Sequence, residues 1–208
     1  MSARDATFLQ TTNGVTQTLS GIIGGIVMLR TQRYKWLVMF AIVIRMVGYG
    51  VMIRLRGAEN PIWELFTVQL LQGFGSGVIL IGTLVSAQIQ VPHSQLAQIT
   101  ALIPCCNFLG SSIGASISGG IYTNALKDEL AKQLGREADQ GLIDSLYNFI
   151  TGRVPAWGTP ERDSINAAYS NVIRYMTLTA VGSMVPSFIL CWVMPNMELP
   201  DQNNLADT

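Results

Sequence analysis

Six neutral amide side chains lie inside otherwise apolar stretches of the sequence, and these are the residues that could bind a polar ligand. They are Gln10, Asn13, Gln17, Gln69, Gln72 and Asn107. The first three are spaced by three and four residues and the next two by three, so each group shares one face of a helix. A polar face is costly in apolar surroundings. It should therefore line a wet cavity or form hydrogen bonds to another helix, and the sequence leaves both readings open.

Two ionisable side chains stand out by their position. Arg45 is the one cation deep inside an apolar stretch. Placing it mid-membrane costs about 2.5–3.5 kcal/mol, so we expect water or a partner such as Tyr49, one turn on. Arg45 could equally orient helices through backbone carbonyls. His93 follows Val91 and Pro92 in a turn, where it could exchange a proton near neutral pH or have a structural role.

The sequence shows no arrangement of residues for catalysis. It has one histidine, no GxSxG motif and no phosphate-binding loop. Its three cysteines lie in apolar segments without CxxC spacing, which predicts packing and no metal site. The net charge is zero, so nothing indicates a nucleic-acid partner. We therefore expect neither an enzyme nor a bound cofactor.

A long stretch without charged residues indicates which structural elements carry these candidate residues. Residues 65–126 are 62 residues without Asp, Glu, Lys or Arg, and only 12% of the chain is charged, against about 25% in soluble domains. One membrane span needs about 20 apolar residues, so the gap fits two spans and a turn. Backbone groups in lipid must bond within their own segment, which predicts helices. The fold class is therefore all-α, a polytopic membrane helix bundle.

We expect five transmembrane helices. They cover about residues 6–29, 36–53, 62–89, 95–123 and 172–195. Residues 124–171 hold twelve of the 26 charged side chains and are predicted to form an external loop. The N-terminus would then also lie outside, and residues 196–208 would form a cytoplasmic tail. Basic residues between the first two spans mildly favour this orientation.

The predicted external loop carries helix signals of its own. Three leucines recur every four residues from Leu126, and a second apolar stripe covers residues 142–150. Both stripes predict amphipathic helices, either on the membrane surface or over the end of the bundle. Thr159 and Pro160 are a typical N-cap and first residue, so a helix should begin there and enter the membrane near residue 171.

Small residues at four-residue spacing predict faces where helices approach closely. They are Gly21 and Gly25, Gly73 and Gly77, and Gly110, Gly114 and Ser118.

Several segments resemble the fungal siderophore-iron transporters of the major facilitator superfamily. The turn GGIVMLRTQRYKW is similar to the basic loop between helices 8 and 9 of that superfamily. The siderophore-transporter pattern is carried by WLVMFAIVIRMVGYGVMIRLR, QLLQGFGSGV, SAQIQVPHSQLAQITAL and LGSSIGASISGGIYTNAL. The resemblance covers about residues 13–195, and residues 91–98 and 109–122 are its most specific parts.

This resemblance implies a fold of twelve core helices, of which the chain would supply the last five as a partial major facilitator fold. It implies proton-coupled uptake of ferric siderophores across the plasma membrane or an endosomal vesicle membrane. The partners would be a ferric siderophore, a proton, the lipid bilayer and the missing N-terminal half of the transporter. The first, third and fourth spans would face the cavity, which makes the six amides candidates for substrate contacts.

The external loop and the substrate remain open on the sequence alone. Trp157 lies between Pro155 and Gly158 in a turn-rich link and could help to capture the substrate, although aromatic residues also anchor helices at membrane interfaces. The alternative functions are a drug/proton antiporter of the same superfamily and a truncated membrane protein that does not transport.

Overall fold

The protein is a bundle of long helices. The computed structural model describes residues 3–55, 62–134, 143 and 159–199. Its α-helices there are α1 (Ala3–Thr31), α2 (Lys35–Leu55), α3 (Ile62–Gln88), α4 (Leu96–Leu134) and α6 (Pro160–Val193), with a 3-10 turn, η1, at His93–Gln95. In this described part of the chain the prediction of an all-α fold is confirmed.

Four of these helices, α2, α3, α4 and α6, are long and apolar enough to cross a membrane. The shortest, α2, has 21 residues, which gives about 31 Å at 1.5 Å per residue and so spans the hydrocarbon core. Trp36, Trp63 and Trp192 are exposed at helix ends, where aromatic side chains commonly meet the lipid headgroups. The protein is an integral membrane protein. The 29-residue α1 is long enough but more polar, so its crossing stays a prediction.

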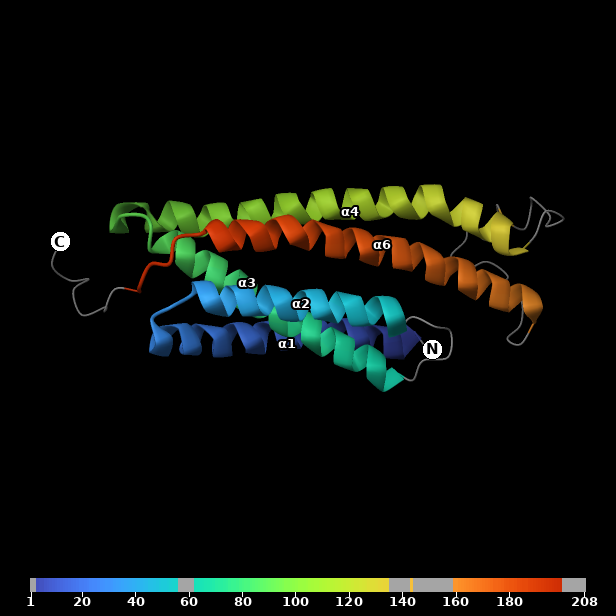
Figure 1. The fold of residues 1–208 in the computed structure, drawn as a ribbon, viewed down its shortest axis with the longest axis horizontal. Helices are drawn as coiled ribbons and strands as arrows, with labels where there is room; N and C mark the ends of the chain where they lie inside the picture. Colours follow the sequence, from blue (N-terminus) through green and yellow to red (C-terminus); the bar gives the residue numbers. More distant parts are fainter. Residues whose placement is uncertain (1–2, 56–61, 135–142, 144–158, 200–208) are drawn as a thin grey trace.

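Figure 1 shows how the ends of the helices group. The α1–α2 turn, the α3–α4 turn and the segment after α6 lie at one end of the bundle, and the N-terminus lies toward the other. At the first end, the buried Tyr34 donates its hydroxyl to the carbonyl oxygen of Pro195, and Lys35 Nζ donates to the Trp192 carbonyl at 2.7 Å. These segments therefore lie together at one end of the bundle, which is the arrangement that the predicted topology requires.

The helices α4 and α6 form a hairpin that extends past the other three helices at the opposite end (Figure 1). The predicted boundaries at residues 123 and 172 are not helix ends, because α4 continues to Leu134 and α6 begins at Pro160. The predicted start is confirmed: the Thr159 side chain accepts a hydrogen bond from the Arg162 backbone N–H, and Pro160 is the first helical residue.

The leucine stripe that begins at Leu126 is therefore the end of α4, and it is not a separate surface helix. Leu126 and Leu130 are fully buried against Ile165 and Val172 of α6. Two helices that cover each other's apolar stripes can extend beyond the lipid as a pair. The second stripe, at residues 142–150, lies outside the described residues except for Ile143, which is buried in the same cluster.

Glycine faces bring α3 into close contact with its neighbours. A Cβ atom at Gly73 would lie 2.8 Å from the Asn13 carbonyl oxygen, and one at Gly77 would collide with the Gln17 carbonyl oxygen on α1. These residues therefore permit backbone contact, as the spacing predicts for Gly73 and Gly77. By contrast, a Cβ at Gly110 or Gly114 on α4 would meet nothing within 4 Å among the described residues.

Candidate functional site

The six predicted amides do not gather in one place. Asn13 Nδ2 donates a hydrogen bond to Gln69 Oε1 at 2.8 Å, which joins α1 to α3. Gln17 lies one turn after Asn13 and is half-buried, and its backbone carbonyl contacts Gly77 of α3. For Asn13 and Gln69 the geometry favours the helix-contact alternative over the cavity alternative.

Gln72 and Gln10 occupy opposite environments. Gln72 is only 6% exposed and packs beside Gly48, with its Nε2 3.2 Å from Met52 Sδ on α2. It lies on the α2–α3 contact. Gln10, near the start of α1, is exposed.

Asn107 belongs to a polar, partly open cavity of about 460 Å³ between α2, α4 and α6. The cavity brings together side chains from three helices that are far apart in the sequence. Its lining consists of Arg45, Tyr49, Cys106, Asn107, Gly110, Ser111, Ala180, Ser183, Met184 and Ser187. Its volume is in the range of small-molecule sites in other proteins. The second and fifth predicted spans therefore contribute to this cavity, whereas the family resemblance implies that the first, third and fourth spans face the transport cavity.

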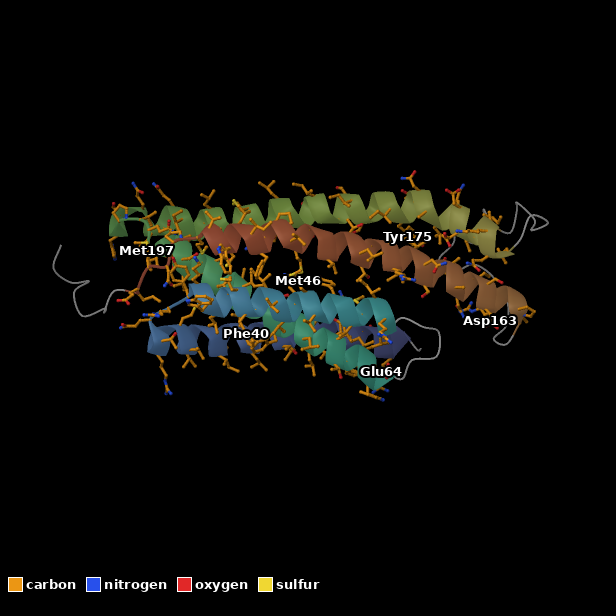
Figure 2. All side chains as sticks on the ribbon, in the orientation of Figure 1. Phe40, Met46, Glu64, Asp163, Tyr175 and Met197 are labelled. Carbon is orange, nitrogen blue, oxygen red and sulfur yellow. The ribbon has the colours of Figure 1, made fainter. Side chains whose placement is uncertain are left out.

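Arg45 dominates the electrostatics of this cavity. It lies ten residues from either end of α2, and its neighbour Met46 lies near the middle of the bundle in Figure 2. Its Nη2 is 3.5 Å from the Tyr49 hydroxyl, and its guanidinium carbon is 5.7 Å from the centre of the Tyr49 ring. Tyr49 is thus the neighbour that the sequence predicts, and among the described residues no ion pair includes Arg45.

Of the remaining two candidates, His93 does not line this cavity. His93 is exposed and opens η1 at the end of the bundle that holds the α1–α2 turn. Beside it, Gln88 Nε2 donates to Thr100 Oγ1 at 2.8 Å and ties α3 to α4. Trp157 lies outside the described residues.

One polar cluster was missed by the sequence reasoning. Glu129, near the end of α4, is 6% exposed and accepts hydrogen bonds from Asn171 Nδ2 at 2.9 Å and from the Tyr175 hydroxyl at 3.2 Å. Lys132 Nζ lies 3.4 Å from the same carboxylate. The sequence contained one signal for this cluster: Asn171 and Tyr175 are four residues apart, so their polar side chains lie on the same face of a helix.

Comparison with known proteins shows what the chain is similar to. No family profile matches the chain, and no solved structure matches it. Curated transporters, however, align with about nine-tenths of its length. Together with the charge-poor helices, these matches show that the chain is homologous to the siderophore iron transporters of the major facilitator superfamily.

Three relatives illustrate this similarity. The siderophore iron transporter ARN1 of Saccharomyces cerevisiae is 29% identical over 94% of this chain and 31% of its own length. The low affinity heme transporter str3 of Schizosaccharomyces pombe is 31% identical over 90% of this chain and 30% of its own length. The siderophore transporter fer7 of Mycosarcoma maydis is 31% identical over 90% and 28%. The chain thus spans about 30% of the length of these relatives.

Proposed function

We propose that the chain is the C-terminal portion of a transporter that takes up ferric siderophores together with protons. The observation that carries this proposal is the match of about nine-tenths of the chain to curated siderophore iron transporters. The charge-poor helices supply the membrane location, and we propose the plasma membrane or an endosomal vesicle membrane as the site of action. The relatives are transporters by name and not enzymes, in keeping with a sequence that offers no catalytic arrangement.

In this proposal the chain moves substrate only as part of a complete transporter. Alternating access needs two halves of a bundle that rock about a site between them. The described helices form a packed group in which Gly73 and Gly77 of α3 lie against the backbone of α1. Such a group can move as one body against a second half, which is the missing N-terminal half of the transporter.

Among the amides, Asn107 is the strongest candidate for substrate contact. It is exposed, whereas Asn13 and Gln69 are joined by a hydrogen bond between α1 and α3. A bulky chelate with many oxygen atoms is suited to neutral hydrogen-bond donors of this kind. Gln10 and Gln17 remain secondary candidates, and Gln72 is too buried to contact a chelate without rearrangement. We also propose that Trp157 contributes to capture on the external side, and that His93 responds to protonation on the opposite side.

A second substrate is supported by one specific relative. The 31% identical str3 protein is a low affinity heme transporter, so heme is the alternative iron chelate. Drug export by antiport is the further alternative within the superfamily, and a membrane protein without transport activity is the alternative outside transport.

A chimera tests the function. The segment of ARN1 that matches this chain is replaced by the chain, and the chimera is expressed in yeast cells without other siderophore transporters. Uptake of radioactive iron as ferric siderophore, uptake of heme and drug resistance are then measured. We expect siderophore uptake by the chimera and none by the chain alone. A chimera that reaches the membrane and takes up only heme, exports only drugs, or transports none of the three would refute the proposal.

A further inference from the structure

We propose that residues 194–199, the segment that follows α6, form a strap that binds the α1–α2 turn and holds the end of α6 against α2. Both segments lie at the same end of the bundle, where Figure 2 labels Met197 of the strap. The proposal rests on the contacts at this end and does not depend on which substrate is transported. In a complete transporter, α6 would follow the α1–α2 turn whenever the bundle moves.

The turn and the end of α6 meet in a regular register. Consecutive residues of the turn face every third residue at and after the end of α6, and the pairs are Lys35 with Trp192, Tyr34 with Pro195, and Arg33 with Glu198. At the first pair, an ammonium group donates to a carbonyl at the C-terminus of a helix, where a positive charge is favourable. At the second pair, the hydroxyl of a fully buried tyrosine donates to a backbone carbonyl. The turn therefore binds the backbone of this segment and fixes where α6 ends relative to α2.

The outer part of the strap pairs with the turn in an extended conformation. Arg33 and Glu198 form an antiparallel bridge, and the Leu199 N–H donates to the Gln32 carbonyl oxygen at 3.1 Å. The ion pair between Arg33 and Glu198, at 3.7 Å, is exposed on both sides and contributes little. Gln32 has a left-handed backbone with a φ of 51°, which is unfavourable for a residue other than glycine and persists where surrounding contacts fix it. The hydrogen bond from Leu199 is one such contact.

The strap closes an apolar seam between α2 and α6. Met184 and Cys191 of α6 are buried in one cluster with Val38 and other residues of α2, and Met194 and Leu199 of the strap pack against the same cluster. Cys191 lies within the last turn of α6 and is only 6% exposed. Release of the strap should therefore expose Cys191, because this residue is the buried member of the seam that lies nearest the end of α6.

Cys191 is thus a native reporter of the strap, and its reaction with a maleimide in detergent micelles measures opening of the seam. The background is Cys105→Ser with Cys106→Ser, since both of these thiols are exposed and would react. Tyr34→Phe removes the hydroxyl that binds the strap and keeps the aromatic ring in the core. Tyr175→Phe is the matched control, because the same atom is removed from a tyrosine that donates to Glu129 on α4.

We expect Tyr34→Phe to raise the labelling rate of Cys191 by roughly 2- to 12-fold, which corresponds to the loss of one hydrogen bond. Tyr175→Phe should leave that rate unchanged. Leu199→Pro, a second variant, should also raise it, because proline has no N–H to donate to Gln32. A rate that is unchanged in Tyr34→Phe or in Leu199→Pro, or that is raised equally in Tyr175→Phe, would overturn the proposal.

Discussion

Glu129 is predicted to hold the projecting ends of α4 and α6 together, and Glu129→Gln is the perturbation that tests this. The carboxylate offers one oxygen to Asn171 at 2.9 Å and the other to Tyr175 at 3.2 Å. Glutamine can accept from Asn171 through its remaining oxygen and donate its amide N–H to the Tyr175 hydroxyl oxygen, which also accepts. Both charge-assisted hydrogen bonds then become neutral ones.

The expected loss is about 2–3 kcal/mol, since a hydrogen bond to a charged group contributes about 1.5–3 kcal/mol, a neutral one contributes about 0.5–1.5 kcal/mol, and two bonds are changed. Lys132 adds little to this figure, because its side chain is 71% exposed and 3.4 Å from the carboxylate. The loss applies to opening of the hairpin ends and does not require the whole bundle to unfold.

Amide hydrogen exchange in detergent micelles measures this local opening. Glu129→Gln should lower the protection of residues 126–134 by roughly 30- to 150-fold, since ~1.4 kcal/mol corresponds to a factor of ten. Asp128→Asn is the matched control, because it removes the same charge from an exposed neighbouring position. Equal protection in the two variants would refute the role of the buried carboxylate.

The same carboxylate gives this opening a pH dependence. Glu129 lies past the charge-free stretch that ends at Leu126, near the end of α4 at Leu134. The hydrogen bond from Asn171 lowers the pKa of Glu129 below its ordinary value of 4.5, burial opposes this shift, and Lys132 and Tyr175 add to the lowering. The stabilisation is therefore fully present above pH 4.5 and is lost as the pH falls through the folded-state pKa. Protection of residues 126–134 should fall over that range in the wild type and stay flat in Glu129→Gln.

Two further predictions concern the packing of α3. Gly77→Ala should destabilise the bundle by about 1–3 kcal/mol, because the new methyl group meets the α1 backbone. Gly50→Ala is the control and should be neutral or stabilising, because a Cβ there meets nothing within 4 Å. Thermal unfolding of both variants in detergent tests this, and equal unfolding midpoints would contradict the close contact between Gly77 and α1. Asn13→Leu and Gln69→Leu should show a coupling of about 0.6–1.7 kcal/mol in a double-mutant cycle. Additive effects would mean that their hydrogen bond does not form in the membrane.

Several features of the protein follow from its sequence alone. The charge-free stretch of 62 residues identifies lipid as the solvent, and lipid permits only helices for segments of this length. Thr159 and Pro160 mark the start of α6, because capping depends on residues within one turn. Gly73 and Gly77 mark a contact face for a similar reason: glycine on a helix presents its backbone to whatever packs there.

The tertiary structure decided which side chains meet. Helical spacing shows that Asn13, Gln17 and Gln69 lie on polar faces. Only the placement of α3 against α1 shows that Asn13 and Gln69 form a hydrogen bond. Asn107, by contrast, is exposed on α4. The leucines from Leu126 onward form an apolar stripe that is visible in the sequence. Only the tertiary structure shows that α6 covers this stripe, so that α4 and α6 project from the bundle as a pair. Glu129 and Arg45 show the same limit. Whether a charge in such a segment is satisfied depends on atoms from helices about 40 to 140 residues away along the chain, and local periodicity carries no information about those partners.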